Sequence, residues 1–228
     1  LEILQEENRS GLPVFAGIIR NSTREAIRCA EDAKALGAEV LLVTPVFYHG
    51  ATDEGHYAYF KAIAAAVYLP IVIYNVVATN IISPELFLKI SEIDEVIGIK
   101  QVAPVKLAEL AVMVAPGIQV YSACDQMLYG TYVSGACGSI SALVTIAPQL
   151  CIDQWNAYLQ GDQTTAAAIQ KKMVPIVRSY LQPPFPGKVK ELINLQGRSG
   201  GLARMPNTGP DEARRRMMRS ALQDAALL

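Results

Sequence analysis

The sequence predicts an α/β protein, a (β/α) barrel in which parallel strands alternate with helices. Six short apolar runs rich in β-branched residues alternate with longer stretches of helical spacing. The runs are continuously apolar, as expected where both faces of a parallel sheet are buried. No G-x-G-x-x-G follows the first run and no P-loop occurs, so a barrel is favoured over an open doubly wound sheet.

The elements follow one another along the chain at the spacing that such a fold needs. Gly37 is a natural C-terminal cap for the first long helix, Thr52 is an expected N-cap, and Ser83 before Pro84 predicts another helix start. The expected strands are residues 12–16, 39–44, 70–74, 95–100, 118–122 and 138–141. The expected helices between and after them are residues 22–36, 52–67, a segment from 83, 105–114, 125–133 and 148–159.

The rest of the chain predicts a helical extension, so we expect a barrel portion at residues 1–160 and an extension at 161–228. Its expected helices are residues 163–180, with a kink at Pro175, 188–195 and 211–226. The basic run 214–216 on the last helix is interpreted as a solvated face or an interface edge. Residues 1–7 resemble the end of a helix. Because a closed barrel needs eight strands, we expect two βα units to be missing from the front.

The composition and charge of the chain argue against several classes of protein. Of 228 residues 51% are hydrophobic and 18% are charged, with a net charge of −1. This balance gives no general attraction to nucleic acid or to anionic membranes, and no apolar run is long enough to span a bilayer. The four cysteines have no C-x-x-C spacing, and only two histidines accompany them. We therefore expect no metal site, free thiols and a cytoplasmic location.

A lysine and a tyrosine end two successive strands. Lys100 closes Val-Ile-Gly-Ile-Lys, and Tyr74 closes Ile-Val-Ile-Tyr. A lysine at the edge of an apolar interior loses solvation of its charged form, so its pKa falls and its amine becomes a nucleophile. A nearby phenol could move the protons that carbonyl chemistry requires. Taken alone, each has a plainer reading: a lysine past a strand often reaches solvent, and a core tyrosine finds any hydrogen-bond partner.

With its context, this pair resembles a known family. Tyr74-Asn75-Val76 followed by Gly98-Ile99-Lys100, together with Val43-Thr44-Pro45, is similar to the class I pyruvate aldolases of the dihydrodipicolinate synthase and N-acetylneuraminate lyase family. The resemblance runs over nearly the whole chain. It implies a (β/α)8 TIM barrel with a C-terminal helical extension, a homotetramer or dimer, and no metal or other cofactor. It also implies a lyase in which a 2-oxo acid such as pyruvate forms an imine with a lysine and reacts with an aldehyde.

The resemblance also implies roles for individual residues. Lys100 would be the Schiff-base nucleophile, Tyr74 the proton-transfer group, and Thr44 a hydroxyl near the proton path. Ile140 would pack against pyruvate, and Tyr48 is a candidate substitute for the tyrosine that synthases supply across a subunit interface, where this chain has Phe47.

Two departures from the family pattern leave alternatives open. Thr79 takes the place where dihydrodipicolinate synthases hold the second substrate's carboxylate with an arginine, which argues against aspartate semialdehyde; Arg20 is a weak substitute. The Gly-Thr-Thr-Gly-Glu segment that binds the pyruvate carboxylate is absent from this sequence. We therefore expect an aldolase with another aldehyde. The alternatives are dihydrodipicolinate synthase itself and a non-catalytic barrel that acts as a binding or scaffold protein.

Overall fold

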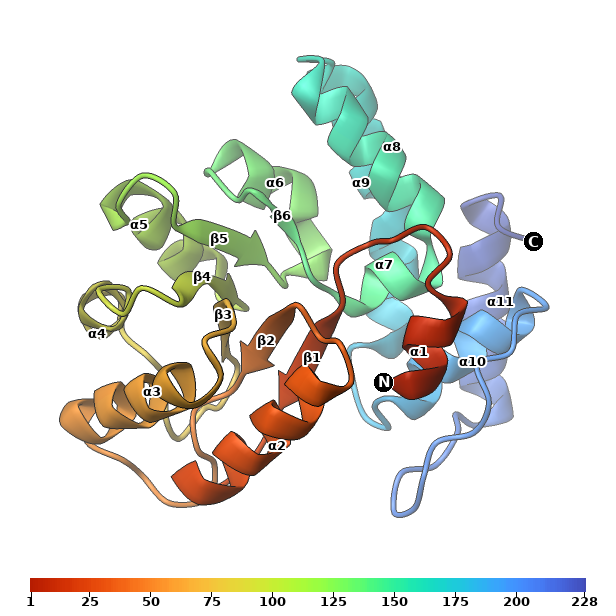
Figure 1. Ribbon diagram of the computed structural model, residues 1–228. Helices are drawn as coiled ribbons and strands as arrows, with labels where there is room; N and C mark the ends of the chain where they lie inside the picture. Colours follow the sequence, from red (N-terminus) through yellow and green to blue (C-terminus); the bar gives the residue numbers. More distant parts are fainter. The chain divides into compact units, whose positions relative to one another are not determined.

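The computed structural model describes residues 1–228, and its strands form one sheet whose order follows the sequence (Figure 1). The first four strands pair in parallel. All six predicted strands are present and the barrel-type topology is confirmed. The strands are β1 (Phe15–Ile18), β2 (Val40–Val43), β3 (Ile71–Asn75), β4 (Val96–Gln101), β5 (Gln119–Ser122) and β6 (Gly138–Ser139).

Helices follow the strands in the alternation that the sequence predicted. They are α1 (Glu2–Glu7), α2 (Thr23–Ala35), α3 (Asp53–Val67), α4 (Pro84–Ile90), α5 (Pro104–Met113), α6 (Leu128–Val133), α7 (Ala142–Ile146), α8 (Pro148–Leu159), α9 (Gln163–Tyr180), α10 (Gly187–Leu195) and α11 (Glu212–Asp224). A 3₁₀ turn at Asp125–Met127 precedes α6, and α9 runs through Pro175.

The predicted N-caps Thr52 and Ser83 are confirmed, and Ser22 caps α2 in the same way. The side-chain oxygen of each accepts a backbone N–H three residues later. These bonds satisfy donors that the first turn of a helix leaves unpaired. Gly37 follows α2 with a φ of +82°, the left-handed conformation that glycine adopts without steric cost.

Two strands and one helix depart from the sequence-based prediction by more than a shift of one residue. The first strand begins at Phe15 instead of residue 12, because its register with β2 starts there and continues to Ile18. The last strand ends at Ser139, since Ser141 already precedes α7. The five-residue helix α7 was not predicted, because so short a segment carries no readable period.

The chain divides into two compact units. The first comprises residues 1–121 and 135–137, and the second comprises residues 122–134 and 138–228. In the first, side chains of β2 to β4 such as Leu41, Ile73 and Ile99 are fully buried. The predicted boundary after residue 160 falls between α8 and α9 within the second unit and stays a prediction.

The second unit has its own core beneath α8, α9 and α11. Tyr132, Met173, Ile176, Tyr180 and Leu222 are buried there. The hydroxyl of Tyr180 donates to the buried carboxylate of Asp125, which also accepts the Leu143 N–H at 3.4 Å. None of the helices in either unit has the length and apolar character needed to cross a membrane.

Candidate active site

The predicted lysine and tyrosine lie side by side on neighbouring strands. Tyr74 of β3 and Lys100 of β4 are paired in the parallel register, so their side chains leave the same face of the sheet. The Nζ atom of Lys100 lies 3.5 Å from the centroid of the Tyr74 ring. Lys100 is only 7% exposed. The pair therefore places an amine against an aromatic face at the carboxyl end of the strands, where barrel enzymes carry their chemistry.

Thr44 joins this pair from the next strand. Val43 of β2 is in register with Ile73, and continuing that register sets Thr44 beside Tyr74. The Thr44 N–H donates to the Ile18 carbonyl at 3.1 Å, which fixes the end of β2 against β1. Thr44 is 1% exposed, and its buried hydroxyl has no hydrogen-bond partner. A buried hydroxyl without a partner is costly, which makes Thr44 a good candidate for contact with a ligand.

Two buried asparagines hold the loops beside the site. Asn80 is 4% exposed; its amide donates to the carbonyls of Val46 at 2.8 Å and His49 at 2.9 Å, and its oxygen accepts the Ala51 N–H at 2.9 Å. Asn75, at the end of β3, exchanges two hydrogen bonds with the backbone of Ile82. These residues shape the loops after β2 and β3.

The sequence analysis gave Asn75 and Asn80 no role. The available signal was an asparagine directly after a buried strand and another in the loop that follows it. Such residues commonly close turns onto the backbone.

The remaining predicted residues lie outside this buried row. Tyr48 is 80% exposed, has a φ of +78° and stacks edge-on against His49. Phe47 beside it is also exposed, and its N–H donates to the Asn21 side chain at 2.8 Å. Thr79 is exposed in the turn before Asn80. Ile140, half-buried, belongs to the second unit and donates its N–H to the Ser122 carbonyl at 2.9 Å.

A model of the dihydrodipicolinate synthetase family matches residues 1–225. The chain belongs to this family. A 4-hydroxy-tetrahydrodipicolinate synthase from Methylibium petroleiphilum is 32% identical over 232 residues, which cover 100% of this chain and 79% of the relative. The corresponding enzyme of Afipia carboxidovorans is 32% identical over 228 residues, 98% of this chain and 77% of the relative.

Solved structures of dihydrodipicolinate synthetase family proteins have the same fold. The dihydrodipicolinate synthase of Thermotoga maritima superimposes with a TM-score of 0.92 at 26% identity, covering 99% of this chain and 79% of that one. A prophage protein of the family from E. coli K12, solved in complex with pyruvate, gives a TM-score of 0.91 at 27% identity, again covering 99% of this chain and 79% of that one.

Membership in the dihydrodipicolinate synthetase family fixes the class of chemistry. Its members are carbon–carbon lyases that work as class I aldolases through a Schiff-base lysine, and they are usually oligomeric. The fold prediction and the predicted enzyme class are therefore confirmed. In the described chain, no three His, Cys, Asp or Glu side chains are grouped so that they could hold a metal ion.

Proposed function

We propose that this chain is a Schiff-base aldolase that joins or cleaves pyruvate and an aldehyde other than aspartate semialdehyde. Lys100 is the nucleophile, Tyr74 transfers protons, and Thr44 lies on the proton path. The observation that carries the proposal is the buried amine of Lys100, in register with Tyr74 and 3.5 Å from its ring. The protein of the same family that was solved with pyruvate supports the choice of 2-oxo acid.

The reaction begins at the Lys100 amine. The amine attacks the C2 carbonyl of pyruvate, and loss of water followed by uptake of one proton gives an iminium in which nitrogen carries the positive charge. That charge lets C3 lose a proton and become an enamine. The enamine carbon then attacks the aldehyde carbon, and the aldehyde oxygen takes up a proton to become a hydroxyl. Hydrolysis of the new imine returns the free lysine, and cleavage follows the same steps in reverse.

We assign these proton transfers to Tyr74. Its register partner is Lys100, and continuing the β2 register sets Thr44, whose buried hydroxyl has no hydrogen-bond partner, on its other side. A phenol and an alcohol in a row can pass a proton without ionising both groups.

Thr79 motivates the choice of aldehyde. A threonine hydroxyl offers one donor, whereas an arginine would grip a carboxylate through two charged hydrogen bonds. We therefore infer an aldehyde partner without a carboxylate at that point, as in a sugar-acid aldolase or hydratase-aldolase. The second candidate is dihydrodipicolinate synthase activity, which the names of the 32% identical relatives favour.

We also propose that the chain acts as a cytoplasmic homo-oligomer, a tetramer or dimer. The exposed aromatic rings of Phe47 and Tyr48 support this, because two large side chains at one loop tip would be covered by a second copy. In such an assembly Tyr48 would supply the hydroxyl that Phe47 lacks. Size-exclusion chromatography with light scattering tests the assembly directly.

The first experiment is borohydride reduction in the presence of pyruvate, followed by peptide mass mapping. We expect one carboxyethyl group on the peptide that contains Lys100. Lys100→Met should abolish the adduct. Lys106→Met is the matched control, because this lysine is exposed on α5 and pairs with Glu109 at 2.9 Å; it should leave the adduct unchanged.

The same experiment decides between the classes of function. A folded protein without an adduct would refute the aldolase proposal and favour a non-catalytic barrel. An adduct at Lys100, combined with rapid turnover of pyruvate and aspartate semialdehyde, would instead establish the synthase and refute our choice of aldehyde. Product analysis with a panel of neutral and hydroxylated aldehydes then identifies the partner.

A further inference from the structure

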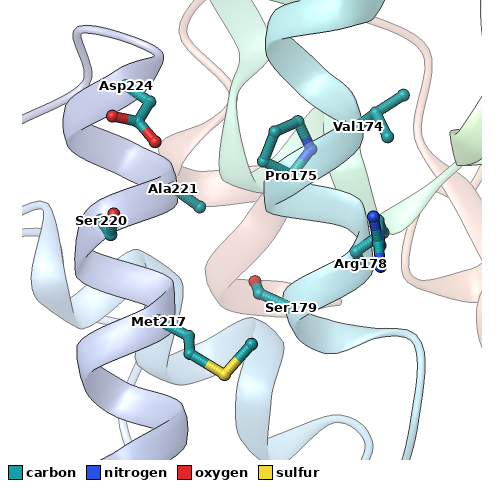
Figure 2. Close-up of a pocket in the computed structure, with 8 residues that line it drawn as sticks. All are labelled: Val174, Pro175, Arg178, Ser179, Met217, Ser220, Ala221 and Asp224. Carbon is teal, nitrogen blue, oxygen red and sulfur yellow. The ribbon is translucent and has the colours of Figure 1, made fainter.

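The second unit contains a groove between α9 and α11 that the aldolase chemistry does not use. Two adjoining cavities of about 430 and 390 Å³ form it, and they share Arg178, Ser179 and Met217. Figure 2 shows the first cavity, with Met217 reaching from α11 toward α9 and Asp224 at one end. We call the two cavities together the α9–α11 groove.

Lys188 lines the second cavity and is almost fully buried. It is 1% exposed, at the start of α10, and its ammonium makes no hydrogen bond or ion pair. The backbone around it is closely packed: a Cβ on Gly187 would lie 2.0 Å from the Thr208 carbonyl oxygen. Burial lowers the pKa of Lys188, the charge of Arg214 lowers it further, and Asp211 acts in the opposite direction. A buried cation without a partner is costly to retain unless something pairs with it.

The charges around Lys188 leave this cavity with an excess of positive charge. Arg178 and Arg214 line it as well, and Asp211 is its one acidic side chain. That carboxylate already accepts the Arg214 N–H at 2.8 Å as the cap of α11 and lies 3.4 Å from the Arg214 guanidinium.

The other nearby acids are also occupied. Glu191 and Glu212 both pair with Arg215, at 2.7 and 3.0 Å. Asp211, Glu191 and Glu212 each therefore pair with an arginine other than Arg178, and none forms an ion pair with Lys188. The N-terminus of α11 adds further positive potential at the same end of the groove.

The rest of the groove is less polar. Met217, Ala213 and Ala221 of α11 and Pro175 and Val174 of α9 line it, and Ser179 lines both cavities. Asp224 at the far end would repel a second anionic group. A ligand that fits this distribution has one anionic head and an apolar body.

We propose that the α9–α11 groove binds a small organic anion, a carboxylate or a phosphate monoester with an apolar portion. Its anionic group lies between Lys188, Arg178 and Arg214, where it supplies the missing partner of the buried ammonium. Its apolar part follows Met217 toward Pro175. All of these residues belong to the second unit, and the inference does not rest on the chemistry at Lys100.

The test is isothermal titration calorimetry of the full chain with hexanoate, hexyl phosphate and inorganic phosphate. We expect saturable binding of at least one organic probe at one site per chain, tighter than that of inorganic phosphate. Stronger binding of hexanoate or of hexyl phosphate tells which head group the site takes. Lys188→Met should weaken this binding by about tenfold or more, the effect of losing one charged hydrogen bond. Lys171→Met, an exposed lysine of α9, is the control and should bind as the unaltered chain does.

Proton uptake separates a binding role of Lys188 from a structural one. An anion favours the charged lysine, so binding at alkaline pH should take up protons, seen as a dependence of the measured enthalpy on the buffer. This uptake should vanish in Lys188→Met. Since a buried lysine also supports packing, Arg178→Gln at an exposed position provides a second variant, and it should weaken binding while leaving thermal unfolding unchanged.

Three results would overturn the proposal. One is the absence of saturable binding of any probe to the unaltered chain. Another is undiminished binding in Arg178→Gln and in Lys188→Met. The third is inorganic phosphate binding as tightly as both organic probes, because the groove would then have no role for an apolar portion.

Discussion

Asn80→Ala removes three hydrogen bonds that hold the loop of residues 46–51 over the end of β2. The lost partners are the carbonyls of Val46 and His49 and the N–H of Ala51, all within 2.9 Å of the side chain. A hydrogen bond of this kind contributes about 1 kcal/mol net, and a buried group left unpaired costs more. We therefore expect the free energy of unfolding to fall by about 3 kcal/mol.

Urea unfolding followed by circular dichroism measures this change. With a slope of about 2 kcal/mol per M, the midpoint should drop by about 1.5 M. Asn8→Ala is the control, because Asn8 also bonds the backbone, at Leu12, but in contact with water. It should lose less than about 1 kcal/mol, since water replaces the missing partner. Equal losses of unfolding free energy in the two variants would refute the argument that burial makes the hydrogen bonds of Asn80 contribute more to stability.

Three further predictions follow from other residues. Burial lowers the pKa of His56 below its ordinary value of 6.5. Because the unfolded chain binds this proton first, stability should fall as the pH drops below about 6.5, and His56→Leu should flatten urea midpoints measured between about pH 7 and pH 5. Gly98→Ala places a Cβ 2.4 Å from the Gln119 carbonyl oxygen and should lower the free energy of unfolding by about 1–3 kcal/mol in the same urea assay. Gly17→Ala is the control and should be tolerated, because no atom lies within reach of its added Cβ. Thr79→Arg should raise kcat/KM for aspartate semialdehyde about tenfold in a coupled assay by adding a bidentate partner for its carboxylate; an unchanged value would show that residue 79 does not meet the substrate.

Sequence patterns predicted most of the fold because the decisive signals are local. Thr52 and Ser83 mark helix starts through their own side chains, and the apolar strands β2 to β4 are buried on both faces. The misplaced elements lack such signals. The helix after Ser141 is too short to show a period, and the segment from Asp125 begins as a 3₁₀ turn that the sequence does not separate from α6.

The sequence predicted some residues of the candidate site and missed the interactions of others. Lys100 and Tyr74 could be paired beforehand, since each ends a strand and neighbouring parallel strands end at one edge. The orphaned hydroxyl of Thr44 and the three bonds of Asn80 depend on distances across the fold, which no local pattern encodes. The groove with the buried Lys188 was missed for the same reason. In the sequence, Lys188 follows a proline-rich segment, and nothing in that pattern distinguishes it from a lysine on the surface.

The order of the strands in the sheet determines which part of the chain contains the candidate site. Every strand lies beside the strand that precedes it in the chain. Contacts between near neighbours in sequence need little loop closure, so they form early. Tyr74 and Lys100 are joined by a single strand–helix–strand segment that includes α4. Both residues of the pair, and the helix that joins their strands, therefore lie in one continuous segment that contains no part of α9 to α11.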